Sequence, residues 1–299
     1  MNDIPDFLNN LLQKQFGEKI VNEVIKGFSV DRLVTLRVNN LKSNIQEVIS
    51  ELDEHYILYD GVKWYENALI IKNAKEDDIR KLEIYKEGKI YMQSLSSMIP
   101  PIILNPNPNE NILDMAAAPG GKTTQVAALS QNLSLITACE KNKIRLDRLK
   151  YNIDKQGATR VNVLSQDARN LDNFFSFDKI LLDAPCSGSG TLSFNNNSFK
   201  YFNEELVNRS KKTQLELIKK AILILKKGGE LVYSTCSILD YENEKIVSEI
   251  LKDGNMEIVP IDFKFFEDVP LLPTSIDGVM CVMPTDLYEG FFVAKFIKK

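Results

Sequence analysis

The stretch Ile112–Thr123 reads ILDMAAAPGGKT, and it decides the fold. Its first residues end an apolar segment and its last residues begin an amphipathic one, so we expect a strand followed directly by a helix. Small residues and two glycines let the backbone approach a ligand closely, and the free N–H groups at the start of a helix favour a carboxylate or a phosphate. The stretch therefore predicts a ligand-binding loop at the carboxyl end of a strand.

Two other interpretations of this loop are open. One is a tight turn between a strand and a helix with no ligand. The other is the phosphate-binding loop of a nucleotide hydrolase, because Gly121-Lys122-Thr123 matches its last three positions. That loop needs a glycine where this chain has Ala116, so the nucleotide-hydrolase hypothesis is weakened without being removed.

Apolar and amphipathic segments alternate regularly from about residue 111 onward. This alternation predicts an α/β fold with a doubly wound, Rossmann-like sheet of seven strands, whose ligands lie at the carboxyl ends of the strands. The expected strands are residues 112–115, 133–139, 161–165, 179–182, 230–234, 256–259 and 291–296. The expected helices are residues 122–130, 143–156, 204–226 and 240–252.

The N-terminal third follows another pattern. We expect helices at 5–25, 43–52 and 77–85, and strands at 34–38, 56–59 and 68–71, which together make a small α+β unit. The sequence thus predicts two domains, residues 1–92 and residues 93–299. The motifs that carry chemistry all lie in the second domain.

Two carboxylates stand at predicted strand ends in register with the glycine loop. Glu140 follows the second strand of the sheet, where an acid is placed to accept hydrogen bonds from ribose hydroxyls. Asp167 follows the third strand and has the position to accept a hydrogen bond from an adenine amino group. Strand-end carboxylates also cap helices and turns, but the pair favours an adenosine ligand that lacks a triphosphate.

Two of the four cysteines lie in polar motifs after neighbouring central strands. Cys186 belongs to Asp183-Ala184-Pro185-Cys186-Ser187-Gly188, and Cys236 to Ser234-Thr235-Cys236-Ser237. Because both motifs follow strands, we expect both thiols to open into one crevice. Cys139 and Cys281 lie inside apolar runs, where a free cysteine is usually a small core residue.

The composition excludes several other kinds of chemistry. The chain has one histidine, His55, and no C-x-x-C pair, so histidine-based catalysis and metal sites are not expected. No apolar run approaches the roughly 20 residues of a membrane span, and no signal peptide is evident, so we expect a cytoplasmic protein. The net charge is −4, yet bases outnumber acids in residues 141–160 and 198–227. This central basic band suits an RNA backbone, or is simply the solvated face of two helices.

Taken together, these residues resemble the Nop/Sun family of RNA cytosine-5 methyltransferases, whose bacterial members act on ribosomal RNA. The resemblance covers nearly the whole chain. It includes Leu36-Arg37-Val38-Asn39, the segment Tyr91–Ser97, the four motifs described above and the segment Glu289–Ala294. The paired cysteines distinguish this family from other doubly wound methyltransferases.

The resemblance implies an enzyme that methylates carbon 5 of cytosine in RNA with S-adenosyl-L-methionine as cofactor. The implied cofactor-binding residues are Ala116, Ala117, Ala118, Pro119, Gly120, Gly121, Lys122, Glu140, Asp167 and Asp183. Cys236 is implied as the nucleophile and Cys186 as the residue that assists product release, whereas spacing alone permits either order. We also expect Lys122 to favour the Cys236 thiolate and Asp183 to contact the cytosine, so that both count as catalytic.

Ribosomal RNA is favoured as the substrate by the resemblance, and transfer RNA is an alternative. A non-catalytic RNA-binding scaffold is a further alternative, although the catalytic motifs are undamaged. We expect a monomer with no metal and no membrane partner. The N-terminal domain is expected to position RNA, with Arg37 and Asn39 near the domain junction; alternatively, Arg37 pairs with an acid across that junction.

Overall fold

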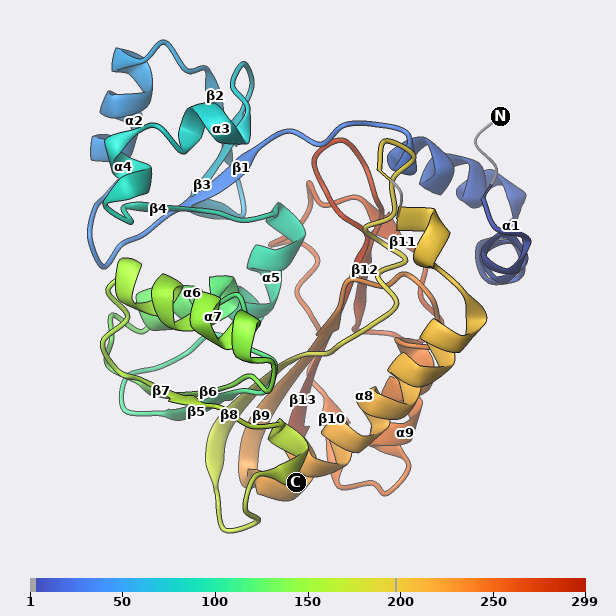
Figure 1. Cartoon of the computed structure of the whole chain (residues 1–299). Coiled ribbons are helices and arrows are strands. Elements are labelled where there is room, and N and C mark those ends of the chain that lie inside the picture. Colours follow the sequence, from blue (N-terminus) through green and yellow to red (C-terminus); the bar gives the residue numbers. More distant parts are fainter. Residues whose placement is uncertain (1–3, 197) are drawn as a thin grey trace.

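The computed structural model describes residues 4–196 and 198–299, and it contains a small N-terminal sheet and a large central sheet (Figure 1). The α-helices are α1 (Asp6–Phe28), α2 (Ile45–Glu54), α3 (Glu76–Ile79), α4 (Glu83–Lys86), α5 (Leu95–Leu104), α6 (Gly121–Leu129), α7 (Lys143–Lys155), α8 (Glu204–Ile224) and α9 (Glu244–Leu251), with 3₁₀ turns η1 (Ala168–Asn170) and η2 (Ser198–Tyr201). The strands are β1 (Thr35–Val38), β2 (Tyr59–Val62), β3 (Tyr65–Ile71), β4 (Ile90–Met92), β5 (Asn111–Asp114), β6 (Leu135–Cys139), β7 (Val161–Leu164), β8 (Phe177–Asp183), β9 (Leu225–Thr235), β10 (Met256–Ile258), β11 (Leu271–Leu272), β12 (Met280–Val282) and β13 (Phe291–Lys298).

The central sheet is parallel in its middle and antiparallel at one edge. Its strand order is β11-β12-β13-β9-β8-β5-β6-β7, and β10 pairs with the far end of β13. The five strands from β9 to β7 are mutually parallel, so their carboxyl ends lie along one edge of the sheet. The chain order reverses between β5 and β8, which is where doubly wound sheets bind their ligands.

Side chains alternate between the two faces of this sheet, as the two-residue period of a strand requires. On β8, Ile180 and Leu182 belong to one buried cluster, whereas Leu181 belongs to the other. Helices α5, α6 and α7 cover the face of Leu181, and helices α1, α8 and α9 cover the opposite face. Both faces are therefore buried, and the predicted doubly wound architecture is confirmed.

The N-terminal sheet is antiparallel, with strand order β2-β3-β1-β4. Helices α2, α3 and α4 pack on it and share a separate buried cluster that includes Leu36, Val48, Leu52 and Ile79. This unit stands beside α5 and α6 at one corner of the molecule (Figure 1).

Helix α1 packs on the C-terminal domain and not on the N-terminal sheet. Leu8, Leu12, Val24 and Phe28 are fully buried in the cluster that also contains α8 and α9. The side chain of Gln15 bonds to the backbone of the loop after β9, through its amide to Ile238 O and its carbonyl to Asp240 N–H, each at 3.0 Å. The domain boundary at residue 92 stays a prediction. Helix α1 precedes this boundary in the sequence but packs against residues that follow it.

All seven predicted strands of the central sheet are present, and two short strands that the sequence did not predict, β11 and β12, extend its edge. Helix α5 and strand β4 were also not predicted, and the single helix expected at 77–85 is two short helices. Pro100 and Pro101 lie inside α5 and argue against a helix there. The carbonyl of Ser97, which Pro101 leaves without its helical donor, accepts Gln93 Nε2 at 3.1 Å.

No helix in the described part of the chain is long and apolar enough to cross a bilayer.

Candidate active site

The loop between β5 and α6 is held in place by hydrogen bonds at the end of β5 and from α7. Asp114, which ends β5 and is 2% exposed, accepts the Thr123 hydroxyl at 2.7 Å. From α7, Arg145 and Asn152 donate to backbone carbonyls of the loop at 2.6 and 2.8 Å. Gly120 has a φ of +111°, a conformation that other residues rarely adopt, and it lets α6 start at once after the loop.

Burial raises the pKa of the Asp114 carboxyl from 3.8 to about 6. The Thr123 hydrogen bond opposes this rise, and the negative charge of Asp183 adds to it. Asp114 is thus a buried acid close to a second acid, Asp183, at the point where the loop leaves the sheet.

A cavity opens at the carboxyl ends of β5, β6 and β7. It is lined by Ala116, Glu140 and Asp167, with the further lining residues Met115, Cys139, Lys141, Arg145, Gln166, Ala168, Pro185, Thr213 and Leu217. The structure therefore brings together the loop and both strand-end acids. The other predicted cofactor residues do not line this cavity. Ala117, Ala118, Pro119, Gly120 and Gly121 form the remainder of the loop and the start of α6, while Lys122 and Asp183 lie in a neighbouring ion pair.

The two acids of the cavity are engaged to different degrees. Glu140 is 6% exposed; one oxygen accepts the Asn142 N–H at 2.8 Å, and the other lies 3.5 Å from Arg145 Nε. Asp167 accepts hydrogen bonds from Arg169 on both oxygens and from Lys141 at 3.1 Å. The Arg169 guanidinium holds the pKa of Asp167 well below its usual range. Glu140 has acceptor capacity to spare, whereas a ligand of Asp167 must displace the exposed Lys141.

The two predicted catalytic thiols meet. Cys186 follows β8 and Cys236 follows β9 directly, and because these strands are parallel neighbours, with Asp183 opposite Ser234, the two motifs emerge side by side. The two sulfur atoms are 3.0 Å apart, and either can donate to the other. Hydrogen bonding to Cys236, followed by burial, raises the pKa of Cys186 well above its usual range.

The other two cysteines are core residues, as expected. Cys139 and Cys281 are 0% and 2% exposed. Burial raises the pKa of Cys139 to about 12 and that of Cys281 well above its usual range.

An ion pair lies at the carboxyl end of β8. Lys122, from the first turn of α6, donates from Nζ to Asp183 Oδ2 and to Ser97 Oγ, each at 2.7 Å. The other oxygen of Asp183 accepts the Ser234 hydroxyl at 2.8 Å, and the Phe291 ring lies 5.3 Å from Lys122 Nζ. Lys122 and Asp183 are therefore joined to each other, and the predicted action of Lys122 on the Cys236 thiolate stays a prediction.

Gly190 and Gly290 let the segment that leads into β13 pack closely against the cysteine motifs. Gly190 donates its N–H to Cys236 O at 3.0 Å, and its own carbonyl accepts the N–H of Gly290 at 2.8 Å. A Cβ atom on Gly190 would lie 2.0 Å from the carbonyl oxygen of Gly290. The backbone approach therefore requires glycine at this position.

Arg37 lies at the domain junction, as predicted, but the alternative that it pairs with an acid there is wrong. It is fully buried, and its hydrogen bonds go to Gln93 Oε1 at 3.2 Å and Thr124 Oγ1 at 3.1 Å. The RNA-positioning role of the N-terminal domain stays a prediction. Asn39 is also at the junction and donates to Gln156 O and Gly88 O, each at 2.8 Å. These residues join the domains.

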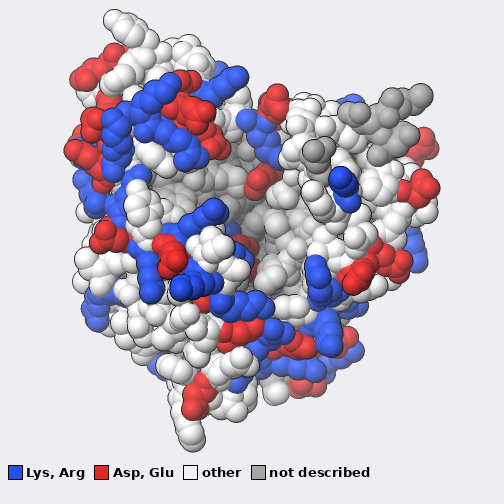
Figure 2. All heavy atoms as spheres, viewed as in Figure 1, with Lys and Arg blue, Asp and Glu red and all other residues white. Residues whose placement is uncertain are grey.

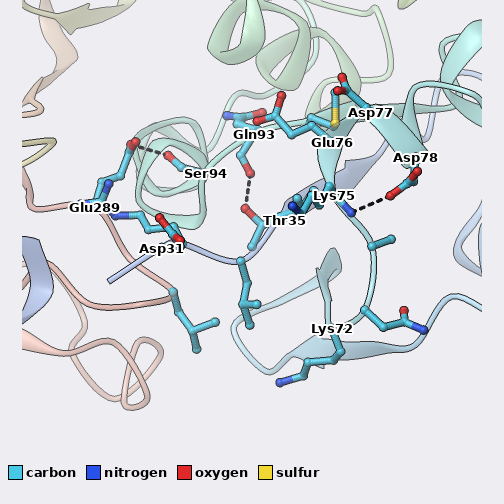
Figure 3. A pocket seen from close by; sticks show the side chains of 17 residues that line it. Asp31, Thr35, Lys72, Lys75, Glu76, Asp77, Asp78, Gln93, Ser94 and Glu289 are labelled. Carbon is cyan, nitrogen blue, oxygen red and sulfur yellow. Dashed lines mark hydrogen bonds between the residues drawn. The ribbon is translucent and has the colours of Figure 1, made fainter. Parts of the chain in front are cut away.

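A separate cavity of about 1030 Å³ lies between the N-terminal sheet and the catalytic domain (Figure 3). At its inner wall Ser94 donates to Glu289 at 2.8 Å, and Thr35 donates to Gln93 O at 2.6 Å. Its acids outnumber its bases, so this cavity is poorly suited to phosphates. The acids are Asp31, Glu76, Asp77, Asp78 and Glu289, and the bases are Arg32, Lys72 and Lys75.

Ser97, Ser234 and Glu242 are site residues that sequence reasoning missed. Ser97 and Ser234 bond to the ion pair, and Glu242 accepts hydrogen bonds from residues that follow both cysteines. Ser97 and Ser234 lie inside motifs that were quoted for their resemblance, but their contacts depend on the fold.

Comparison with known proteins places this geometry in a family. Residues 101–297 match the family described as 16S rRNA methyltransferase RsmB/F, and residues 4–76 match its ferredoxin-like domain. The chain belongs to the RsmB/F methyltransferase family. The resemblance seen in the sequence motifs is thereby confirmed, including that of the N-terminal domain.

Individual RsmB/F relatives are similar over nearly the whole chain. Ribosomal RNA small subunit methyltransferase F of Shewanella loihica is 33% identical over 98% of this chain and 62% of its own length. The 28S rRNA (cytosine-C(5))-methyltransferase of Mus musculus is 34% identical over 98% of this chain and 38% of its own length. This chain thus spans less than two thirds of either relative. The crystal structure of a methyltransferase homolog protein from Pyrococcus horikoshii superposes with a TM-score of 0.84, at 29% identity, over 98% of this chain and 94% of that one.

Proposed function

We propose that this protein methylates carbon 5 of cytosine in ribosomal RNA, with S-adenosyl-L-methionine as methyl donor, Cys236 as nucleophile and Cys186 assisting release. The observation that carries the proposal is the pair of thiols 3.0 Å apart at the ends of two adjacent parallel strands. The family and the printed names of its members support ribosomal RNA as the substrate class. Transfer RNA is the alternative substrate.

The cavity beside the glycine loop fits the adenosine part of this cofactor. Glu140 is buried at its edge with acceptor capacity to spare, which suits the two ribose hydroxyls. The side chain of Ala116 is small, so a ligand can approach its backbone closely. The Asp167 carboxylate can accept a hydrogen bond from the ligand when Lys141 is displaced. When bound, S-adenosyl-L-methionine supplies an electrophilic methyl group. Asp183 and Lys122 do not line this cavity and form an ion pair at the end of the neighbouring strand β8.

Thiol chemistry is required because carbon 5 of cytosine is a weak nucleophile. Addition of the Cys236 thiolate to carbon 6 forms a sulfur–carbon bond and shifts an electron pair to carbon 5, which then bonds to the methyl group. Loss of the carbon 5 proton to a base or water held by Cys186 lets the sulfur–carbon bond break and restores the ring. The Cys186 S–H is placed to stabilise the Cys236 thiolate before attack, because its own pKa is raised.

Asp183 is proposed to select the base. Its carboxylate is fixed between Ser234 and Lys122 and accepts hydrogen bonds, so it suits the amino group of cytosine and repels the carbonyl that uracil has at that position. Lys122 is the cation paired with this acid, at 2.7 Å. The target base must leave its stack to reach these groups, which costs a few kcal/mol.

RNA is proposed to lie across the face that contains the thiols. Figure 2 shows a hollow in the middle of this face with Lys and Arg side chains gathered below it, in the region of α7. The exposed bases of α7 are Lys143, Arg145, Arg148 and Lys150. Such side chains bind phosphates without reading sequence, and they predict affinity that falls steeply with salt.

The experiment is a trap for the covalent adduct. Purified protein is incubated with methyl-labelled S-adenosyl-L-methionine and 16S rRNA, 23S rRNA or tRNA transcripts, and complexes are separated on denaturing gels. Cys186→Ala is expected to accumulate an RNA adduct, whereas Cys236→Ala forms none and transfers no methyl group. Cys281→Ala, which alters a buried thiol on β12, serves as the control and behaves as the unaltered protein.

Turnover by both Cys186→Ala and Cys236→Ala at the unaltered rate would rule out the two-thiol scheme. Binding of RNA with no methyl transfer by the unaltered protein to any transcript or to assembled subunits would favour the non-catalytic scaffold. Bisulfite sequencing of ribosomal and transfer RNA from cells with and without the protein identifies the modified cytosine.

A further inference from the structure

Glu242 is a fully buried carboxylate in the loop between β9 and α9. Its Oε1 accepts the backbone N–H of Ser187 at 2.8 Å and the amide of Gln214 at 3.3 Å. Its Oε2 accepts the Ser187 hydroxyl at 2.5 Å and the Ser237 hydroxyl at 2.7 Å. Four donors converge on this side chain, which is what a buried ionised carboxylate requires.

The two serines are the residues that directly follow the two thiols in the chain. Ser187 comes after Cys186, and Ser237 comes after Cys236. One carboxylate therefore ties together two turns that are about fifty residues apart in sequence. The backbone of Glu242 is fixed as well, because its carbonyl accepts the Tyr233 hydroxyl at 2.6 Å from within β9.

The charge of Glu242 acts on Cys186. Its negative charge is among the causes that raise the pKa of Cys186, after the hydrogen bond to Cys236, burial and the charge of Cys236 itself. Burial raises the pKa of Glu242 above its ordinary value, and the hydrogen bonds from Ser187, Ser237 and Gln214 oppose that rise. The carboxylate therefore depends on these donors for its charge.

We propose that Glu242 is the positioning residue of the thiol pair: its hydrogen bonds clamp both cysteine turns, and its negative charge beside Cys186 disfavours a thiolate at that residue. This inference rests on the proposed function, which needs one thiolate and one proton donor at this place. Glu242 acts through the serines and through its charge and does not contact the substrate.

The first test follows the thiols themselves and requires no RNA. Iodoacetamide reacts with thiolates, so the alkylation rates of Cys186 and Cys236, resolved by peptide mass spectrometry from pH 6 to 10, report which thiol is ionised. Glu242→Gln keeps the size and an acceptor oxygen but removes the charge. We expect alkylation of Cys186 at pH 8 to rise roughly tenfold, which is the size typical of removing one neighbouring charge.

The matched control is Glu244→Gln. Glu244 is also a buried glutamate, 5% exposed and two residues further along, but its charge acts on the pKa of Cys281. This variant is expected to leave alkylation of Cys186 unchanged. An unchanged rate in Glu242→Gln, or an equal rise in both variants, would overturn the assigned role of the charge.

The clamp is tested separately with the carboxylate in place. The double variant Ser187→Ala/Ser237→Ala removes both hydroxyl donors and serves also if Glu242→Gln does not fold. Diamide, an azo oxidant, takes up two electrons and two protons as two thiols form a disulfide, and the loss of 2 Da from the intact mass measures the rate. We expect this rate to fall at least about tenfold in the double variant, since the sulfurs are no longer held together. An unaltered rate would refute the clamp.

These results are independent of the proposed function. If the unaltered protein transfers no methyl group to any RNA but the alkylation and oxidation results hold, the thiol clamp stands and the activity assignment fails. If methyl transfer proceeds with unaltered pH dependence in Glu242→Gln, the role of the Glu242 charge fails and the activity assignment stands.

Discussion

Replacement of Asp114 by asparagine is predicted to stabilise the protein. The folded chain holds the proton of this carboxyl more tightly than the unfolded chain, because burial raises its pKa from 3.8 to about 6. The free energy of unfolding therefore declines as the pH rises through this interval, and the loss is complete above it. The difference between the two pKa values corresponds to a loss of about 3 kcal/mol at pH 8, and to about half of that at pH 5.

Asparagine removes the charge and keeps the shape. Its carbonyl can accept the Ala116 N–H, as Asp114 Oδ1 does now, and its amide can donate to the Thr123 hydroxyl oxygen, whose O–H now donates to Asp114 Oδ2. We expect Asp114→Asn to raise the free energy of unfolding by about 1 to 3 kcal/mol at pH 8 and by clearly less at pH 5. Urea unfolding followed by circular dichroism at both pH values measures this.

The control is Asp147→Asn, because Asp147 is exposed on α7 and its replacement is expected to change stability by less than about 0.5 kcal/mol. A gain in Asp114→Asn that is the same at both pH values would show that the charge is not its source. A loss of stability at pH 8 would refute the reasoning altogether.

Three further predictions concern the loop packing, α1 and the cofactor cavity. Gly190→Ala places a Cβ 2.0 Å from the carbonyl oxygen of Gly290 and is expected to lower the unfolding free energy by about 1 to 3 kcal/mol in urea titrations. The control Gly61→Ala, whose added Cβ meets no atom within 4 Å, is expected to leave it unchanged. Phe28→Ala empties a fully buried site between α1 and the C-terminal domain and is expected to lower the unfolding free energy by about 3 to 5 kcal/mol in one cooperative transition. The control Phe174→Ala, at a side chain that is 96% exposed, is expected to change it by less than about 0.5 kcal/mol. A separate early unfolding transition in Phe28→Ala would contradict the shared core. Glu140→Gln weakens a charged hydrogen bond to the cofactor and is expected to raise its dissociation constant about tenfold or more by calorimetry, with unfolding unchanged; equal affinity would remove Glu140 from the cavity's function.

The sequence predicted best where a local pattern determines the structure. Strands β5 to β9 each contain a short group of apolar residues, and each is followed by a motif at the same edge of the sheet. The meeting of Cys186 and Cys236 followed from that rule alone. The order of their roles did not, and it stays a prediction.

The sequence predicted poorly where tertiary contacts override local preference. Two adjacent prolines hid α5, which is stabilised by side chains of Gln93 and Gln125 that bond to its carbonyls. Strands β11 and β12 are two and three residues long and exist only because they pair with each other and with β13. An arginine such as Arg37 can contact RNA when it is exposed, but here it is buried among neutral partners. The pattern of charges in the sequence does not show this burial.

The packing of α1 also sets an order of events during synthesis. Helix α1 leaves the ribosome before the elements it packs against, and Gln15 finds its partner Ile238 only after 223 further residues have been added. At about 5 to 20 residues per second, that interval is roughly 10 to 45 s. For most of it the apolar side of α1, with Leu8, Leu12 and Phe28, lacks the partners that cover it in the folded protein. Helix α1 therefore docks late, and a nascent chain of this protein offers a chaperone an exposed apolar helix face.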